Sequence, residues 1–285
     1  MALAVPAPYL RPTTLSDALA ALAEAPRLVV AGGTDVYPAH ATRPVERAVL
    51  DVTRIEGLRG ISRDDAGGWR LGATTTWTDI AEHAGLPAAF DGLRHAARQV
   101  GGRQIQNMGT VAGNVVNASP AADGTPNLLA LDAVVECTSA ARGVRQLPLA
   151  SFLTGYRATA LAADELVTAV LVPPVSDDAR SVFHKLGSRA YLVISIVAVG
   201  VVVVVRDGLV VDARVSVGAC SPVPVRLDGL EQAVRGAPAG ASLATLVTAD
   251  ALADLTPIDD VRGPAAYRLE AARTLVARAL VEATS

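Results

Sequence analysis

Glycines gather with small polar residues at two points of the chain, a composition that suits anion binding. The first is Gly32-Gly33-Thr34-Asp35, which follows a short apolar stretch at residues 28–31 that predicts a buried strand. Its backbone N–H groups and the Thr34 hydroxyl can cradle a phosphate without a side-chain cation. A tight turn explains the same residues, so both interpretations stay open. The spacing is neither Gly-x-Gly-x-x-Gly nor Gly-Lys-Ser/Thr, and it therefore supports neither a Rossmann site nor an NTPase phosphate loop.

The second point is Gly109-Thr110-Val111-Ala112-Gly113-Asn114. Small residues there let a ligand approach the backbone closely, and Thr110 and Asn114 can form hydrogen bonds. One such loop is weak evidence, whereas two loops together suit a pyrophosphate-linked dinucleotide. Asp123, which follows nine residues beyond Asn114, can accept a hydrogen bond from a ribose hydroxyl. It is equally well explained as an Asx turn or a helix cap before Gly124.

The other reactive residue types form no catalytic or metal-binding motif. The two cysteines, Cys137 and Cys220, are far apart, which excludes a self-contained zinc ribbon or iron–sulfur cluster, because each needs about four clustered ligands. The histidines lack the His-x-x-x-His spacing of a helical metal site, and there is no serine or cysteine nucleophile signature. We therefore expect no metal in this chain, and any chemistry to be that of a cofactor.

Length and composition exclude several classes of function. The 285 residues suggest about two domains. A net charge of -3 with 4% aromatic residues lacks the basic surface and the stacking side chains typical of nucleic-acid binding. Residues 1–14 have no cationic start and contain three prolines, unlike a signal peptide, so we expect a cytoplasmic protein. The apolar run 191–205 is too short for a membrane-spanning helix, and its β-branched residues predict a buried strand.

The predicted elements around these loops indicate how the chain is divided. Thr14 and Asp17, three residues apart, predict the start of a helix over residues 18–25. A further strand at residues 48–52 closes a small α/β unit, so we place a first boundary near residue 53. The segment 173–178, with two prolines followed by polar residues, is the best linker candidate. We therefore expect a domain 1–175, made of subdomains of about 1–53 and 54–175, and a second domain 176–285.

Two further patterns describe the second domain. Residues 195–205 and 209–217 predict a β-hairpin, since an Arg-Asp-Gly turn signal separates two β-branched runs. Residues 265–284 repeat apolar side chains at helical spacing and predict a long amphipathic helix.

A series of motifs extends in a fixed order over nearly the whole chain. These are Tyr9-x-Arg11-Pro12, Ala31-Gly32-Gly33-Thr34-Asp35, Gly72-Ala73-x-x-Thr76-x-x-Asp79, Gln104-Ile105-x-Asn107-x-Gly109-Thr110, Gly113-Asn114-x-x-Asn117-Ala118-Ser119-Pro120-Ala121-Ala122-Asp123, Phe152-x-x-Gly155-Tyr156-Arg157 and Pro257-Ile258-Asp259-Asp260-Val261-Arg262. In order and spacing the chain resembles the medium, FAD-binding subunit of the molybdenum hydroxylases, the family that includes xanthine dehydrogenase and carbon monoxide dehydrogenase. No single motif is specific, but the series is.

The resemblance implies a fold and a set of cofactor contacts. The fold is mixed α/β (α+β) of the vanillyl-alcohol-oxidase or PCMH type, in which two subdomains clasp FAD and a C-terminal α/β domain with an antiparallel sheet follows. Both glycine loops would hold the pyrophosphate, with Asp123 on the adenosine side. Lys185 would place a cation near the flavin, favouring its anionic reduced form. The implied FAD contacts are Val29, Val30, Ala31, Gly32, Gly33, Thr34, Asp35, Val100, Gly101, Thr110, Val111, Gly113, Asn114, Asp123, Leu166, Lys185 and Tyr191.

Three of these contacts carry particular expectations. Leu166 would pack an apolar side chain on the cofactor. Tyr191 would shield the isoalloxazine face, although a core aromatic explains it equally well. A plain surface position is the alternative for Lys185.

The resemblance also implies an oxidoreductase that acts in electron transfer. A large partner subunit with a molybdenum–pterin cofactor would oxidise the substrate, 2Fe–2S clusters of a small partner subunit would relay the electrons, and FAD on this chain would pass them to NAD+, a quinone or O2. The expected assembly is a heterohexamer, a dimer of heterotrimers. The alternatives are a standalone FAD-dependent oxidase of the same fold and a non-catalytic flavin- or nucleotide-binding interaction module.

Overall fold

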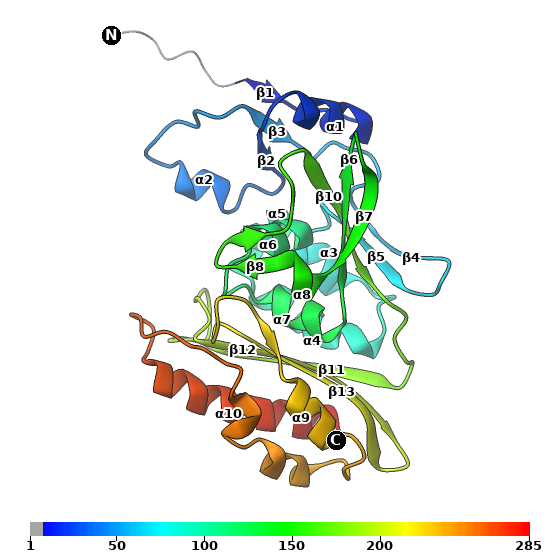
Figure 1. Cartoon of the computed structure of the whole chain (residues 1–285), viewed down its shortest axis with the longest axis vertical. Coiled ribbons are helices and arrows are strands. Elements are labelled where there is room, and N and C mark those ends of the chain that lie inside the picture. The colour runs from blue at the N-terminus through cyan, green and yellow to red at the C-terminus, as the bar shows by residue number, and fades with distance from the viewer. Residues whose placement is uncertain (1–7) are drawn as a thin grey trace.

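Residues 8–285 are described by a computed structural model, in which three units follow one another along the long axis of the molecule (Figure 1). The N-terminal unit lies at the top of Figure 1 and contains a three-stranded parallel sheet of order β1-β3-β2. Its elements are β1 (Tyr9–Leu10), α1 (Leu15–Glu24), β2 (Leu28–Val30), α2 (Val36–Ala39) and β3 (Val49–Asp51).

Helix α1 begins where the capping residues predict. The Thr14 hydroxyl accepts a hydrogen bond from the Asp17 N–H at 3.2 Å, which satisfies one of the free amides of the first turn. Ala18 and Leu22 of the helix are buried in the same hydrophobic cluster as Leu50 of β3. The predicted helix and the strands at residues 28–31 and 48–52 are confirmed to within a few residues.

The middle unit is built on a five-stranded antiparallel sheet of order β4-β5-β10-β6-β7. Its strands are β4 (Ile61–Arg63), β5 (Trp69–Gly72), β6 (Val134–Ser139), β7 (Gly143–Pro148) and β10 (Glu165–Val172), and β8 (Leu153–Gly155) and β9 (Ala158–Thr159) form a small hairpin beside it. Its helices are α3 (Trp77–Glu82), η1 (Ala88–Phe90), α4 (Asp91–Gln99), α5 (Arg103–Met108), α6 (Val111–Asn117), α7 (Gly124–Ala130) and α8 (Leu149–Phe152).

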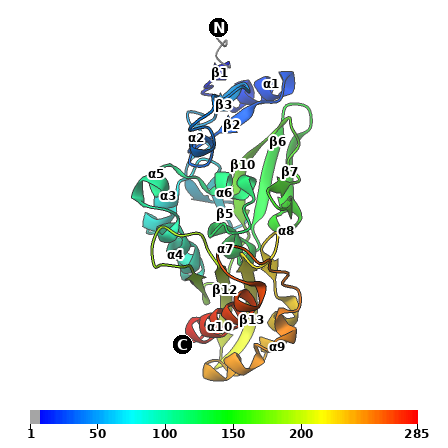
Figure 2. The same cartoon turned by 90° about the vertical axis from the view of Figure 1, so that its left-hand side faces the viewer.

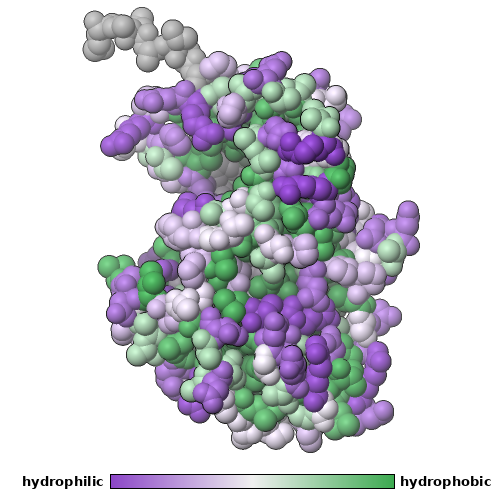
Figure 3. Space-filling model, viewed as in Figure 1, coloured by the Kyte–Doolittle hydropathy of each residue, from purple (hydrophilic) through white to green (hydrophobic). Residues whose placement is uncertain are grey.

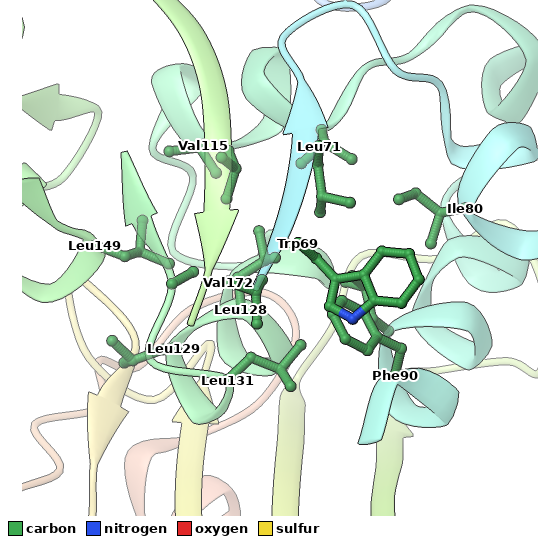
Figure 4. Packing of buried hydrophobic residues seen from close by; sticks show 14 of the residues in the cluster. Trp69, Leu71, Ile80, Phe90, Val115, Leu128, Leu129, Leu131, Leu149 and Val172 are labelled. Atoms are coloured by element: carbon green, nitrogen blue, oxygen red, sulfur yellow. The ribbon is translucent and has the colours of Figure 1, made fainter. Parts of the chain in front are cut away.

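The core of the middle unit lies between this sheet and its helices (Figure 4). Trp69 and Leu71 lie on either side of Arg70 in β5 and so point to one face of the sheet. Trp69 meets Phe90 edge to face, with ring centroids 5.8 Å apart. Burial of each large apolar side chain contributes about 1.5–3 kcal/mol, so this core fixes the helices that carry the second glycine loop.

The C-terminal unit contains a four-stranded antiparallel sheet of order β11-β12-β13-β14. Helix α10 packs on one face of this sheet, and α4 and α7 of the middle unit pack on the other (Figure 1). The elements are β11 (Ala179–Leu186), β12 (Val197–Arg206), β13 (Leu209–Gly218), β14 (Val225–Arg226), α9 (Asp228–Val234), η2 (Ala241–Leu246), η3 (Asp250–Leu252) and α10 (Ala265–Ala283). The predicted hairpin and C-terminal helix are confirmed.

Strand β12 is apolar along nearly its whole length because both of its faces are covered. Val201 and Val203 belong to the core shared with α10, whereas Val202 and Val204 belong to the core of the middle unit. Gly200 lets α7 approach closely, since a Cβ atom there would lie 3.0 Å from the backbone of Asn127. The sheet is thus the joint between the two units.

One sequence expectation for this strand is wrong. The run 191–205 was expected to be buried throughout, but β12 begins at Val197 and residues 191–194 lie in the loop that joins it to β11. Strand β11 ends at Leu186, which pairs with Val197, so the preceding residues have no neighbouring strand to pair with. Tyr191 is consequently 68% exposed. Within residues 8–285, no helix has both the length and the apolar character needed to cross a bilayer.

Candidate cofactor site

The two glycine loops meet, although more than seventy residues separate them in the sequence. The first follows β2 of the N-terminal unit, and the second comprises the turn between α5 and α6 of the middle unit together with the first residues of α6. A Cβ atom on Gly32 would overlap the carbonyl oxygen of Met108 and lie 3.0 Å from the Gly109 nitrogen. Only glycine permits this backbone-to-backbone contact. The contact brings the amides of both loops to one site.

The second loop is held in place by the segment that follows β5. The Trp77 N–H donates to the Gly109 carbonyl oxygen at 3.1 Å, and the Val111 N–H donates to the Thr75 carbonyl oxygen at 2.9 Å. The Thr110 hydroxyl accepts from the Gly113 N–H at 3.0 Å and caps α6. These bonds fix the loop independently of the N-terminal unit.

A cavity of about 510 Å³ lies between the two loops, where the N-terminal and middle units meet. Figure 3 shows that the surface is hollowed at this level, just below the N-terminal unit at the top. The volume falls within the range of roughly 300–1,000 Å³ found for small-molecule sites. Of the contacts expected from the sequence, those in the lining are Val29, Ala31, Gly32, Gly33, Thr34, Asp35, Val100, Thr110, Gly113, Asn114 and Leu166.

The remaining expected contacts lie outside this lining. Val30 and Val111 are buried, and neither lines the cavity. Gly101 adjoins Val100 in a turn with φ of +55°. Tyr191 is exposed on the β11–β12 loop, so its side chain is not the core aromatic that was the alternative.

The lining also contains residues that were not among the expected FAD contacts, and two of these, Gly109 and Ala112, lie within the second glycine loop. Ala73 and Asn117 belong to motifs that carried the resemblance, so their positions were visible in the sequence although their function was not. No pattern in the sequence indicated the apolar residues of the cavity wall, because their burial depends on elements far apart in the chain. The additional lining residues are Val36, Val52, Ala73, Thr74, Trp77, Ile105, Gly109, Ala112, Val116, Asn117, Leu161, Glu165 and Val167.

Polar groups of the cavity are left without partners. Within residues 8–285, the N–H groups of Gly32, Gly33 and Thr34 donate no hydrogen bond to the protein. The buried side-chain oxygen of Asn114 likewise has no partner among the described residues. Gly33 is buried, and buried polar groups are normally satisfied, so its N–H and the Asn114 oxygen point to a ligand with both acceptors and donors. Gly33, with φ of +69°, shapes the consecutive amides into an anion-binding turn.

The described lining of the cavity contains no lysine or arginine, so a bound phosphate would be held by amides. Its one deeply buried carboxylate, that of Glu165, is neutralised from outside the lining. Arg145 forms two hydrogen bonds of 2.7 Å with this carboxylate, and the Ala162 N–H donates a third at 2.8 Å. Arg145 thereby holds the pKa of Glu165 below its ordinary value. The pair anchors the loop that brings Leu161 to the cavity.

Asp123 and Lys185 form a buried ion pair next to the cavity. The Lys185 ammonium lies 2.6 Å from one carboxylate oxygen of Asp123, and the Ser195 hydroxyl donates to the other at 2.5 Å. The two charged side chains are 7% and 8% exposed, which rules out a plain surface lysine. Burial raises the pKa of Asp123, and the neighbouring ammonium opposes this effect.

The residue that follows Asp123 in the chain lies against the lining of the cavity. The next residue is Gly124, where a Cβ atom would lie 2.9 Å from the side-chain oxygen of Asn114, a lining residue. Asp123 precedes α7 in the position of a helix cap, but its side chain makes no capping hydrogen bond. The side chain is directed instead at Lys185 of β11 and at Ser195, and so ties the middle unit to the C-terminal unit.

Metal ligands do not gather anywhere in the described part of the chain. Within residues 8–285, no group of three or more histidine, cysteine, aspartate or glutamate side chains could hold a metal ion. Cys137 and Cys220 are free and buried.

Two glycine loops with free amides, joined across an apolar cavity between two α/β units, define a protein that binds a dinucleotide cofactor. A family model described as "FAD binding domain in molybdopterin dehydrogenase" matches residues 3–175, and one described as "CO dehydrogenase flavoprotein C-terminal domain" matches residues 182–283. The chain therefore belongs to the FAD-binding subunits of the molybdopterin dehydrogenases.

Individual relatives agree with this assignment. The xanthine dehydrogenase FAD-binding subunit of Escherichia coli O157:H7 is 30% identical over 282 residues, which cover 98% of this chain and 96% of that protein. The nicotinate dehydrogenase FAD-subunit of Eubacterium barkeri is 34% identical over 238 residues, covering 81% and 80%. A structure of carbon monoxide dehydrogenase from Hydrogenophaga pseudoflava matches with a TM-score of 0.89 at 25% identity, over 99% of this chain and 98% of that one. The expected family and mixed α/β fold are confirmed.

Proposed function

We propose that this chain is the FAD-carrying electron-transfer subunit of a multi-subunit molybdenum hydroxylase. It would accept electrons from iron–sulfur clusters of a small partner subunit and pass them to NAD+, a quinone or O2. The observation that carries the proposal is the set of unpaired amides at Gly32, Gly33 and Thr34, opposite the second glycine loop. FAD, when bound, supplies a centre that takes up electrons singly and releases them singly or in pairs.

The residues of this chain would bind and orient the cofactor rather than react. The three amides and the Thr34 hydroxyl would hold the pyrophosphate, and the side-chain oxygen of Asn114 would accept a hydrogen bond. Val29, Val100 and Leu166 would exclude water from the remainder of the cofactor. The residues present thus fit a molecule with an anionic centre and apolar ends.

The role that we propose for Lys185 differs from the one expected from the sequence. Its ammonium is paired with Asp123, so the two charges largely cancel at a distance. We propose that Lys185 acts with Asp123 as a positioned dipole near the cofactor. This arrangement would favour an anionic reduced flavin less strongly than an unpaired cation.

The assembly and the compartment are also part of the proposal. The names of the relatives describe FAD subunits of dehydrogenases, which supports a large molybdenum-containing partner and a small iron–sulfur partner. We infer a dimer of heterotrimers in the cytoplasm. The named substrates of the relatives differ, and the substrate here would be set by the large partner.

The test is a flavin measurement on the purified chain. We expect one FAD per chain by absorbance, released as FAD and not FMN on denaturation. The variant Gly113→Val should lose at least tenfold in FAD affinity, because even a Cβ atom there would lie 2.8 Å from the Thr110 hydroxyl oxygen. A wild-type chain that binds no FAD would contradict the proposal and the standalone oxidase alike. A flavin-loaded chain that oxidises a substrate without partners would favour the oxidase.

A further inference from the structure

The motif Pro257-Ile258-Asp259-Asp260-Val261-Arg262 contributed to the family resemblance, but none of its residues lines the cofactor cavity. It lies shortly before α10, the helix that packs on β12. Figures 1 and 2 show β12 between α10 on one side and α7 on the other. Asp123 directly precedes α7. Contacts at the start of β12 can therefore connect the motif to the charged pair beside the cavity.

Two arginines connect the motif to the backbone at the start of β12. The Asp260 carboxylate lies 2.6 Å from Arg262 and 2.5 Å from Arg268. Arg262 also donates to the Ser195 carbonyl oxygen at 3.0 Å, and Arg268 donates to the Ile196 carbonyl oxygen at 2.9 Å. Arg268 is fully buried, and the donors of a guanidinium group have fixed directions. Two consecutive carbonyl groups are thus held by a rigid network.

The hydroxyl group of Ser195 connects this network to Asp123. Ser195 is fully buried, and its hydroxyl donates to Asp123 Oδ1 at 2.5 Å, while the Lys185 ammonium lies 2.6 Å from Oδ2. Each carboxylate oxygen therefore has its own donor. Burial raises the pKa of Asp123, and both Lys185 and Ser195 oppose this rise. Ser195 thereby helps to keep Asp123 ionised and in contact with Lys185, so that the charge of Lys185 stays cancelled.

The charge balance of this pair matters to a flavin, because reduction by two electrons and one proton leaves a negative charge on the ring. An ammonium group that is paired with a carboxylate stabilises such an anion weakly, whereas an unpaired ammonium stabilises it strongly. A group that holds Asp123 against Lys185 would therefore lower the reduction potential of the cofactor without touching it.

We propose that Ser195 is a positioning residue of the cofactor site, which Arg262 and Arg268 hold in place so that it fixes Asp123 against Lys185. The proposal rests on the proposed function, because that function supplies the flavin beside the pair. It adds a role for the motif before α10. The C-terminal unit, through the start of β12, would set the reduction potential of a cofactor bound between the other two units.

The first test is the midpoint potential of FAD in the purified full chain, measured against a reference dye. Asp123→Asn should shift the reduction equilibrium at least tenfold towards the reduced flavin, which is about 30 mV for two electrons. Ser195→Ala removes only the hydroxyl and should shift it in the same direction, at least threefold but less than Asp123→Asn. The control is Ser216→Ala on β13, a buried serine whose hydroxyl has no partner among the described residues. It should leave the potential unchanged.

The second test asks whether Ser195 acts through Asp123. The double variant Ser195→Ala/Asp123→Asn should have the potential of Asp123→Asn alone. Arg262→Lys keeps a cation near Asp260 but lacks the planar fork that also reaches the Ser195 carbonyl oxygen. It should raise the potential in the wild-type background and cause no further change in the Ser195→Ala background. This comparison decides the question even if Asp123→Asn does not retain FAD.

The outcomes separate a positioning role from a structural one. If Ser195 only stabilises the fold, Ser195→Ala will lower the unfolding free energy and leave the potential unchanged. An unchanged or lowered potential in flavin-loaded Ser195→Ala would overturn the proposal, as would a shift of equal size in the Asp123→Asn background. No shift in Arg262→Lys would remove the role of the motif. A wild-type chain without FAD would contradict the proposed function itself, which separates the two failures.

Discussion

The α-carbon of Gly32 lies against the main-chain carbonyl oxygen of Met108 and leaves no room for a side chain. This contact joins the N-terminal unit to the middle unit at the point where their loops form one cavity. The cavity has its present width at this end only because residue 32 is glycine and carries a hydrogen atom where alanine would carry a methyl group.

Gly32→Ala should weaken FAD binding by at least tenfold, because the added methyl group forces the two loops apart. The backbone oxygen it meets cannot rotate away as a flexible side chain would. A fluorescence titration of the apoprotein with FAD measures the effect. Gly229→Ala on α9 is the matched control, since no atom lies within 4 Å of the added Cβ. Equal affinity in Gly32→Ala and wild type would show that the loops do not both contact the cofactor.

The buried pair of Asp123 and Lys185 should behave as a unit in unfolding experiments. Lys185→Met alone leaves a buried carboxylate and Asp123→Asn alone leaves a buried ammonium, and each change should cost about 3–5 kcal/mol of unfolding free energy. The double variant should cost clearly less than the sum of the two. Urea unfolding of the four proteins gives this coupling. Strictly additive losses would mean that the pair contributes no mutual stabilisation.

Acid should destabilise the C-terminal unit through Asp260. Arg262, followed by Arg268, holds the pKa of Asp260 far below its ordinary value. A carboxylate with a lower pKa in the folded state stabilises the fold above its unfolded pKa of about 3.9, and this contribution is lost as the pH falls through the folded pKa. Unfolding free energy measured from pH 6 to pH 2 should therefore fall less steeply in Asp260→Asn than in wild type.

The control for this prediction is Asp177→Asn, at an exposed carboxylate that forms no ion pair with another described residue. Its acid profile should follow that of the wild type. Identical slopes for Asp260→Asn and wild type would contradict the prediction. At pH 7 the Asp260 variant should also be less stable, because Arg268 is fully buried and would lose its carboxylate.

Both thiols should resist alkylation in the folded chain. Burial raises the pKa of Cys137 to about 11 and that of Cys220 to about 12, so almost no thiolate is present at pH 8. Iodoacetamide should modify neither residue over hours in buffer and both within minutes in urea, as followed by mass spectrometry. Since the folded pKa values are raised, the neutral thiols favour the fold below pH 8.5, and this contribution falls at more alkaline pH. Rapid labelling of the folded protein would contradict their burial.

Local rules predict the fold wherever the residues that determine a helix cap or a turn are close neighbours in the sequence. Thr14 caps α1 through its immediate neighbour Asp17, and Asp207-Gly208 turns the β12–β13 hairpin with both φ angles positive. The run 191–205 shows where such rules end. Its composition is that of a strand throughout, but a strand also needs a partner, and β11 ends too early to provide one for residues 191–194.

The site was predictable to the extent that it is made of backbone. The two glycine loops can be recognised in the sequence, because no other residue type allows their close contact. The Asp123–Lys185–Ser195 cluster did not, because its members come from three segments that only the packing of α7 on β11 and β12 brings together. The Glu165–Arg145 pair was equally hidden, since a charged residue in a strand usually faces solvent.

Leu166 belongs to β10 of the middle unit, yet its side chain is part of the hydrophobic core of the N-terminal unit and also lines the cavity. Cofactor binding and attachment of the N-terminal unit therefore share one side chain, and the two equilibria are linked. A ligand at a hundredfold excess over its Kd would add about 2.7 kcal/mol to that attachment. The bound dinucleotide would therefore hold the N-terminal unit on the middle unit. Any force that displaced the N-terminal unit would in turn appear as a change in cofactor affinity.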